Sequence, residues 1–229
     1  MTSLNLPQKP KILTPQERRE RNKEEMRKLI LDTALEIMHE DGAGALNLNE
    51  LARRVHLKTS SLYVYFPGKM AIYDALYRFG IRIFTEELDR ITGSIVDPWQ
   101  ALEAVITRTI EISVDRPELF QICFERPIPG FQPSPHSMSE TGELTARMSR
   151  LLARALPVAT PESPQNLPVQ HGLFIALWHG LTALHIANDP DLPAGKGRFG
   201  SLIPAGIRLI KSYPLQTGPQ PGLTPVQKE

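Results

Sequence analysis

Apolar side chains recur along this chain at steps of three and four residues, the spacing that marks one face of an α-helix. The first long run, residues 16–42, shows this spacing clearly. Its apolar-face residues are Met26, Leu29, Ile30, Thr33, Ala34, Ile37 and Met38. No segment alternates apolar and polar residues with the period of two that a half-buried strand requires. The sequence therefore predicts an all-α fold.

Prolines, glycines and capping residues divide the chain into about nine predicted helices. Asp97-Pro98 is typical of a helix start, and Pro67-Gly68 ends a helix. Two Pro-rich segments, 126–139 and 157–168, are expected to be loops. The predicted helices span residues 16–42, 47–55, 59–66, 69–90, 98–115, 118–124, 140–156, 169–188 and 200–213.

Two of these predicted helices are only about two turns long and are joined by three residues, 56–58. The run "NLNE" has the pattern of a capping box, with Asn47 as the N-cap and Glu50 reaching back to it. A pair of short helices with so tight a turn is a helix-turn-helix. In such a unit the second helix lies in the major groove of DNA, with its N-terminal residues facing the bases.

The second short helix carries many hydroxyl groups, within the segment "LKTSSLYVYFPGK" at residues 57–69. Short hydroxyl side chains let a helix approach bases and phosphates closely, and tyrosines carry hydroxyls on long rigid arms. A lysine at a helix N-terminus adds an ammonium to free backbone N–H groups that favour phosphate. We expect Leu62 and Phe66 to face inward. The residues expected at DNA are Thr59, Ser60, Ser61, Tyr63, Tyr65 and Lys69.

The charge of the chain is nearly balanced, with a formal net charge of +1. Residues 1–80 hold 13 Lys/Arg against 10 Asp/Glu, which places the positive charge near the N-terminus. Cys123 is the one cysteine, so no intrachain disulfide can form, which fits a reducing cytoplasm. The N-terminal residues lack a signal-peptide pattern, and His171 and His179 make the apolar run at 169–187 a buried helix rather than a span. We expect a cytoplasmic protein without membrane contact.

The segment "LNLNELARRVHLKTSSLYVYFPGKMAIYDAL" resembles the DNA-binding domain of the tetracycline-repressor (TetR) family of bacterial regulators, over roughly residues 25–77. The residues that carry the resemblance are Ala34, Gly42, Leu48, Leu51, Ala52, Val55, Leu62, Tyr63, Tyr65, Phe66, Lys69 and Leu76. It implies a double-stranded DNA operator as partner. The implied DNA contacts are Asn47, Asn49, Lys58, Thr59, Ser60, Ser61, Tyr63, Tyr65 and Lys69.

Two positions depart from the family pattern. His56 stands in the turn, where the family usually has glycine, and we expect a locally adjusted turn that keeps the motif. Lys58 stands where the family usually caps the recognition helix with Ser or Thr, so we expect Thr59 to act as the cap instead. The alternative for the whole unit is a pair of short helices with a small-residue face that binds nothing.

The apolar helix predicted at 169–188 carries a stripe made only of small residues, which lets another backbone pack closely. A single helix-turn-helix makes few base contacts, so such proteins bind as dimers, and the resembled family uses its last two helices for this. We therefore predict a homodimer, with small-residue packing inside one chain as the alternative. The predicted interface is Gly172, Ala176, Gly180, Ala183 and Ala187, with Leu202, Ile203, Ile207, Leu209 and Ile210.

The resemblance also implies an effector pocket among the C-terminal helices. Its expected wall is mostly apolar, which favours a hydrophobic or aromatic small molecule, and each wall residue has plain core packing as its alternative. The run Trp178-His179-Gly180 further resembles the C-terminal domain class of this family that is named for it. The candidate lining residues are Phe84, Ile106, Phe120, Phe124, Met148, Trp178, His179 and Leu181.

Enzymatic motifs are not found in the sequence. Three histidines on the apolar helix diverge around its axis, so they cannot share a metal ion. No phosphate loop, dinucleotide glycine pattern or serine elbow occurs, so we expect no enzyme, metal or cofactor. Cys123, within an apolar segment, is expected to be a core residue.

These patterns together predict a ligand-responsive, dimeric DNA-binding regulator, most simply a repressor on a palindromic operator. The predicted divisions are a flexible arm (1–15), a helix-turn-helix domain (16–68), an effector and dimerisation domain (69–213) and a disordered tail (214–229). One alternative is a helical small-molecule-binding or catalytic protein whose N-terminal domain docks another protein. A second is an architectural DNA binder without an effector.

Overall fold

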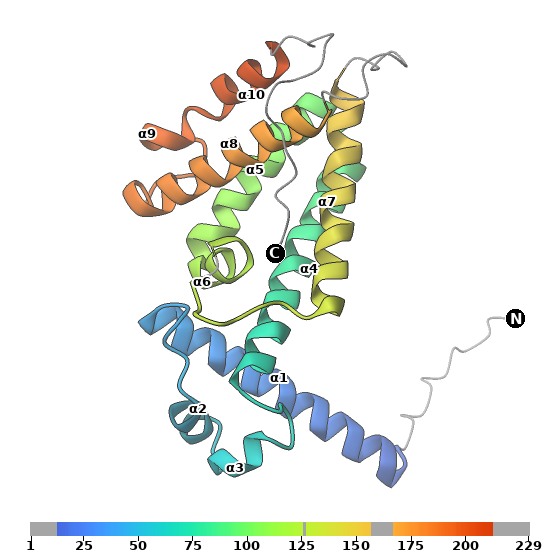
Figure 1. The fold of residues 1–229 in the computed structure, drawn as a ribbon, viewed down its shortest axis with the longest axis vertical. Coiled ribbons are helices and arrows are strands. Elements are labelled where there is room, and N and C mark those ends of the chain that lie inside the picture. The colour runs from blue at the N-terminus through green and yellow to red at the C-terminus, as the bar shows by residue number, and fades with distance from the viewer. Residues whose placement is uncertain (1–12, 126, 157–166, 213–229) are drawn as a thin grey trace, which may run out of the picture. The chain divides into compact units, whose positions relative to one another are not determined.

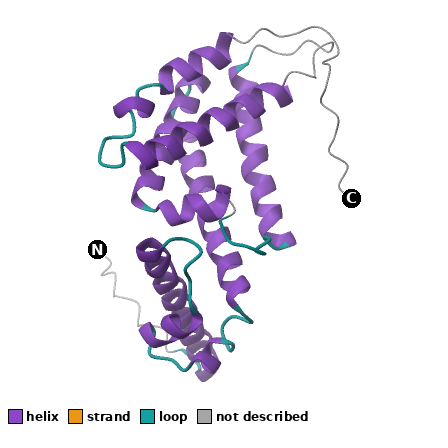
Figure 2. Ribbon diagram, turned by 60° about the vertical axis from the view of Figure 1, so that its left-hand side comes forward, coloured by secondary structure: helices purple, strands orange, loops and turns teal. Residues whose placement is uncertain are grey.

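The computed structural model describes residues 13–125, 127–156 and 167–212, and these residues form helices without any strand (Figure 2). The predicted all-α fold is confirmed. Most of the predicted arm at 1–15, the tail at 214–229 and most of the loop at 157–168 lie outside the described residues. None of the helices in the described part of the chain is both long and apolar enough to cross a membrane.

The helices follow one another as Figure 1 shows, and the chain divides into two compact units, Met1–Ala75 and Leu76–Glu229. Helix α4 is continuous through the point of division. The helices are α1 (Pro15–Asp41), α2 (Leu48–Arg54), α3 (Thr59–Leu62), α4 (Lys69–Ser94), α5 (Pro98–Asp115), α6 (Pro117–Phe120), the π-helix η1 (Gln121–Glu125), α7 (Pro135–Ala155), α8 (Leu167–Asn188), α9 (Gly197–Gly200) and α10 (Ile203–Ser212).

Several element bounds differ from those the sequence predicts. Helix α7 begins within the expected loop, because the Ser134 hydroxyl caps it by accepting from the backbone N–H of Ser137 at 3.2 Å. Pro135 then occupies the first helical position, where the missing N–H costs nothing. Helix α3 ends at Leu62, and the residues up to Phe66 continue as a turn. The four-residue α9 was not predicted.

The first unit is held together by apolar side chains from α1, α2 and α3. Ile30 and Ala34 of α1, Leu51 of α2 and Leu62 of α3 are each no more than 2% exposed. Phe66, in the turn after α3, is 3% exposed, so Leu62 and Phe66 face inward as expected. The inward side of the short helix α3 is therefore covered, while its outward side remains available.

The second unit is arranged around α5, which packs against α6, α7, α8 and α10. The part of α4 that belongs to this unit runs beside α7 (Figure 1). The two helices are joined by polar contacts, among them the hydroxyls of Tyr77 and Thr141 at 2.7 Å. The Arg78 guanidinium also donates to Glu140 at 3.2 Å. These links fix α4 and α7 as two walls of the same unit.

Cys123 of η1 packs against the backbone of α4, as its expected core role requires. The thiol is buried, and burial raises its pKa well above the ordinary value, which disfavours the reactive thiolate. A Cβ added at Gly80 of α4 would lie 2.5 Å from the Cys123 Sγ. Glycine at this position therefore lets η1 approach α4 closely.

We expect the substitutions Gly80→Ala and Cys123→Ala to be coupled in stability. While Cys123 is present, the methyl group that Gly80→Ala adds meets the sulfur, so the two single effects should deviate from additivity by about 1–3 kcal/mol. With Cys123→Ala already present, Gly80→Ala should stabilise by about 1 kcal/mol through helix propensity. Urea midpoints of the four variants measure the coupling.

The matched control is Gly142→Ala on α7, where an added Cβ meets nothing within 4 Å. This substitution should stabilise equally in both backgrounds. Additive effects of Gly80→Ala and Cys123→Ala would contradict the close approach of η1 to α4.

Candidate DNA interface and effector cavity

The turn between α2 and α3 is retained in spite of its histidine. His56 adopts a left-handed backbone conformation with φ 56°, and it is the only non-glycine residue with a positive φ in the part of the chain that the structure describes. The Leu57 N–H then donates to the Ala52 carbonyl at 2.8 Å, closing the turn. The turn is kept, as expected, but without the expected adjustment, because His56 itself takes the left-handed conformation at a cost of about 1–2 kcal/mol relative to glycine.

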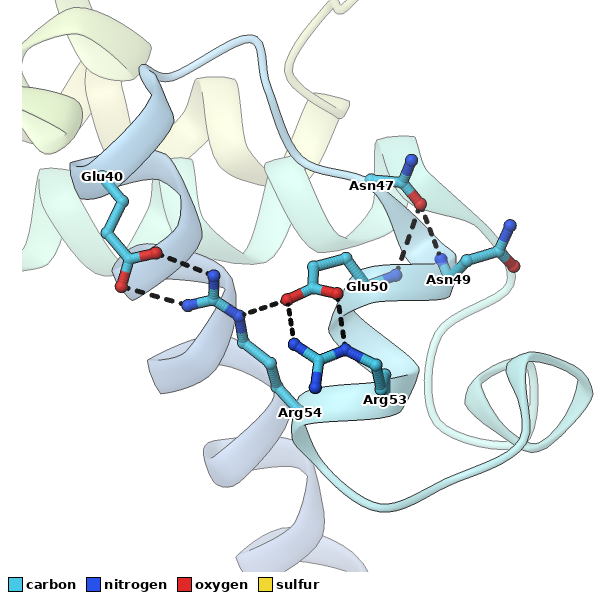
Figure 3. Close-up of polar contacts among 6 residues, drawn as sticks. All are labelled: Glu40, Asn47, Asn49, Glu50, Arg53 and Arg54. Atoms are coloured by element: carbon cyan, nitrogen blue, oxygen red, sulfur yellow. Dashed lines mark hydrogen bonds and ion pairs between the residues drawn. The ribbon is translucent and has the colours of Figure 1, made fainter.

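Asn47 caps α2 as predicted, because its side-chain oxygen accepts from the backbone N–H groups of Asn49 at 2.8 Å and Glu50 at 3.4 Å. The reciprocal half of the predicted capping box is wrong. The Glu50 carboxylate bonds instead to Arg53 at 2.8 and 2.6 Å and to Arg54 at 2.7 Å (Figure 3). Two charged guanidinium donors bind a carboxylate more strongly than one backbone amide does.

Arg54 connects α2 to α1. Its guanidinium lies between two carboxylates, with Glu40 of α1 at 2.7 and 3.1 Å on one side and Glu50 on the other (Figure 3). The bonds from Arg53 and then Arg54 lower the pKa of Glu50 to about 2. The bond from Arg54 also holds the pKa of Glu40 below its ordinary value. The positive charges of α2 are thus paired within the protein rather than left for phosphates.

Helix α3 is tied to α2 by a side-chain hydrogen bond. The Thr59 hydroxyl donates to the Asn49 side-chain oxygen at 2.9 Å. The expectation that Thr59 caps α3 is therefore wrong: α3 begins at Thr59, and Lys58 occupies the cap position without a side-chain bond. Asn49 and Thr59, both candidate DNA contacts, also fix the spacing of the two helices.

The nine candidate DNA contacts run from the N-cap of α2 to the first residue of α4, all within the first unit. Tyr63 is 55% exposed, directly after α3. Five of the nine side chains are exposed and four are partly buried, and none is fully buried. The exposed ones are Asn47, Asn49, Lys58, Ser60 and Tyr63, and the partly buried ones are Thr59, Ser61, Tyr65 and Lys69.

Arg27 is a residue that sequence reasoning missed. Its guanidinium on α1 donates to the backbone carbonyl of Tyr65 and stacks 4.3 Å above the Phe66 ring. It thereby anchors the segment that follows α3. Arg27 lies three residues before the buried Ile30, on the same side of α1, and this spacing is the signal that was available.

The second unit contains a cavity of about 200 Å³. Five of the eight predicted lining residues reach it: Phe84, Phe124, Met148, Trp178 and His179. The other three, Ile106, Phe120 and Leu181, are buried but do not line it. The lining residues that were not predicted are Leu88, Val105, Thr109, Thr141, Leu144, Thr145, His171 and Ile175.

Aromatic rings form one wall of this cavity. The Phe124 ring lies 5.1 Å from that of Phe84, 4.9 Å from Trp178 and 5.1 Å from His179, measured between ring centroids. Phe124 belongs to the π-helix η1, and such irregular turns are frequent at functional sites. Burial lowers the pKa of both His171 and His179, which favours their neutral forms.

The predicted dimer residues divide into two groups. Gly172, Ala176 and Ala187 of α8 are exposed, and Gly180 and Ala183 are partly exposed. In contrast, Ile203, Ile207 and Ile210 of α10 are at most 5% exposed, because they pack within their own chain. The exposed large apolar residues are Leu173 and Leu184 of α8, Leu209 of α10, and Leu202 in the turn just before α10.

Helix α10 packs closely against one side of α8. The side of α8 that carries Gly172 and Gly180 has no protein neighbour in the described chain. A Cβ at Gly206 of α10 would lie 2.6 Å from the Leu177 side chain of α8. A Cβ at Gly172 or Gly180 would meet nothing within 4 Å. Within the described residues, no three His, Cys, Asp or Glu side chains are grouped to hold a metal ion.

An all-α chain with an exposed, tightly braced helix-turn-helix and a separate helical unit belongs to the class of DNA-binding regulators. Residues 30–76 match the family model described as "Bacterial regulatory proteins, tetR family". No curated protein matches the sequence. The match assigns residues 30–76 to the TetR-family DNA-binding domain, which supports a transcriptional regulator of that family.

Solved structures share the fold over most of the chain. SCO4313 matches with a TM-score of 0.69 and 23% identity, covering 86% of this chain and 98% of that one. FadR from Bacillus subtilis, solved with stearoyl-CoA, matches at 0.59 and 15%, covering 81% and 97%. AibR, solved with isovaleryl coenzyme A and operator DNA, matches at 0.56 and 16%, covering 81% and 96%.

We expect the Glu50 cluster to make stability depend on pH in a defined direction. Because the pKa of Glu50 is depressed from 4.5 to about 2, its contribution is fully present above pH 4.5 and is lost as the pH falls through about 2. The difference in urea midpoint between the wild type and Glu50→Gln should therefore shrink over that window. Glu36→Gln, an exposed carboxyl of α1, is the matched control. A difference that does not change between pH 5 and pH 2 would contradict the cluster.

Proposed function

We propose that this regulator is a homodimeric repressor that binds a palindromic operator and releases it when a small apolar effector fills the cavity of the second unit. The observation that carries the proposal is the α3 segment, in which Leu62 and Phe66 are buried while Ser60 and Tyr63 are exposed. Thr59 bonds α3 to α2, and Arg27 bonds the residues that follow α3. Arg54 bonds α2 to α1. A rigid, narrow helix of this kind suits insertion into a major groove.

The roles of the DNA contacts follow from their exposure. Ser60 and Ser61, near the start of α3, are in position to meet bases, whereas Tyr63, Tyr65 and Lys69 suit the flanking phosphates. Asn47, the N-cap of α2, and Lys58, at the cap position of α3, would touch the DNA backbone. Asn49 and Thr59 share a hydrogen bond. We therefore propose that they both hold α3 against α2 and contact the DNA.

Dimerisation is proposed through the exposed face of α8, with the exposed side chains of α10 at its margin. Small residues at Gly172, Ala176 and Gly180 permit a second backbone to approach closely. Leu202 and Leu209, 46% and 69% exposed, add apolar area that water covers in the single chain. The two recognition helices of the twofold-symmetric dimer then bind the two half-sites of the operator.

Effector control is proposed to act through α4, which continues from the first unit into the cavity wall at Phe84 and Leu88. An effector shifts the balance between the DNA-binding and released states only by its difference in affinity for them. FadR and AibR, which share the fold, were solved with acyl-CoA compounds, and AibR also with operator DNA. These neighbours support a ligand-responsive regulator.

The remaining assignments follow from this role. We place the DNA-binding domain at 16–68 and the effector and dimerisation domain at 69–213. The protein acts in the cytoplasm, where its operator is, and has no catalytic step of its own. A helical protein that docks another protein through its N-terminal unit is the alternative, and salt dependence separates the two, because phosphate contacts make affinity fall steeply with salt.

We expect Tyr63→Phe to weaken specific retardation of the DNA flanking the protein's own gene roughly tenfold, because a phosphate loses one hydroxyl donor. The combined change Tyr63→Ala and Lys69→Ala should abolish specific retardation in a gel-shift measurement. Absence of any retardation of this DNA by the wild type at low salt would contradict the proposed function.

Lys69→Gln should lower the slope of log affinity against log salt by about one, as for one lost phosphate contact. Lys211→Gln on α10 is the matched control and should leave the slope unchanged. An equal slope for the wild type and Lys69→Gln would remove Lys69 from the DNA interface.

We expect Ala176→Arg to split the dimer, because it places a charge on the exposed small-residue face of α8. Light scattering after size exclusion should report a monomer, and operator affinity should fall with it. Ala153→Arg, on the exposed side of α7, is the control and should remain dimeric. A dimer that persists in Ala176→Arg would place the interface elsewhere.

A further inference from the structure

We propose that the cavity of the second unit selects an uncharged, ring-containing ligand and rejects carboxylates and ammonium ions of the same shape. This proposal rests on the proposed function, in which that cavity is the effector site. It goes further by naming the charge and shape of the ligand.

The first ground is the lining itself. Thirteen described residues border the cavity, and no Lys, Arg, Asp or Glu is among them. Eight of the thirteen are the apolar or aromatic side chains Phe84, Leu88, Val105, Phe124, Leu144, Met148, Ile175 and Trp178. An ionised ligand would lose its hydration there without gaining an opposite charge, which is far more costly than burying a neutral group.

The polar lining groups fit a neutral ligand. Three threonines, Thr109, Thr141 and Thr145, are among the lining residues. The hydroxyls of Thr141 and Thr145 donate to backbone carbonyls of α7, so their remaining lone pairs can accept a hydrogen bond from an uncharged donor. The two lining histidines, His171 and His179, are the titratable groups among the lining residues, and burial lowers the pKa of both. At neutral pH they therefore supply hydrogen bonds but no counter-charge for an anion.

Nearby arginines are already paired with carboxylates. Arg78 bonds Glu140 at 3.2 Å, and Arg147 pairs with Asp89 across α4 and α7. Arg108 contacts Glu87 at 3.3 Å and Glu111 at 2.9 Å. Moving one of these guanidinium groups to a ligand would break an existing ion pair. The arginines near the cavity therefore do not neutralise a negatively charged ligand inside it.

The shape of the cavity sets the second part of the proposal. Its volume of about 200 Å³ equals the space of roughly seven water molecules, below the usual range for drug-sized pockets. Along one wall, the ring centroid of Phe124 lies 5.1 Å from that of Phe84 and 4.9 Å from that of Trp178. A flat ring placed against them adds edge-to-face contacts of the kind they already make with each other.

The test compares three probes of nearly one shape by calorimetric titration of the full chain at pH 7.5. The probes are 2-naphthol, 2-naphthoate and 2-naphthylmethylammonium, of which only the first is uncharged. We expect 2-naphthol to bind with a dissociation constant at least about tenfold lower than either ion. Equal or tighter binding of either ion would overturn the proposal, and so would failure of all three to bind.

A substitution that introduces charge makes the test specific to this cavity. Thr145 of α7 borders the cavity and is also exposed to solvent, so Thr145→Lys should leave folding intact. The added ammonium should allow the cavity to bind 2-naphthoate. Ala146→Lys adds the same charge one residue away, at an exposed position outside the lining, and should not. Equal gains in naphthoate affinity for both variants would show that the charge acts from a distance and would overturn the lining argument.

A substitution that fills the space locates the neutral probe. Ile175→Trp should abolish 2-naphthol binding while the cooperative thermal unfolding transition is retained, because the new ring occupies the cavity. Undiminished binding in this variant would place the probe elsewhere and overturn the proposal. If 2-naphthol binds but no ligand of its class releases DNA, the effector role of the proposed function fails while the selectivity of the cavity stands.

Discussion

A helix of four residues cannot hold itself together in water, so α3 depends on contacts made by the rest of the first unit. The decisive one is the burial of Leu62 and Phe66, spaced four residues apart and 2% and 3% exposed. Burying two such side chains contributes about 3–6 kcal/mol, an upper value because the unfolded chain already buries some apolar area. This anchoring of one side leaves the opposite side, with its hydroxyl groups, free for a partner.

Polar contacts add orientation to that burial rather than much stability. The side chains of Arg54, Glu50 and Glu40 are 25%, 33% and 53% exposed, and ion pairs that remain in contact with water contribute little individually. These bonds fix the relative orientation of the helices, because Arg54 bonds α2 to α1 and Thr59 bonds α3 to α2. The same pairing neutralises the arginines of α2. We therefore propose that DNA affinity relies on hydroxyl groups, backbone N–H groups and Lys69 more than on these arginines.

Sequence patterns predicted those parts of the structure that depend on interactions between residues close together in the chain. Helical periodicity, the cap at Asn47 and the inward direction of Leu62 follow from spacing along one helix, and the predicted all-α fold and regulator family were confirmed. Five of the eight predicted cavity residues line the cavity.

What the sequence did not reveal depends on distances across space. The bond from Arg54 to Glu40 of α1 spans 14 positions of sequence. Arg27 reaches Tyr65 across 38 positions of sequence. The inward packing of Ile203, Ile207 and Ile210 depends on how closely Gly206 brings α10 to α8, a contact that no periodicity within α10 specifies.

A hydroxyl-radical footprint of the protein on the DNA flanking its own gene tests most directly whether two braced α3 helices address one duplex. The account predicts two protected segments related by a twofold axis, with centres one helical turn or a multiple of it apart, about 34–36 Å for one turn. A single protected segment, or uniform protection without register, would contradict it.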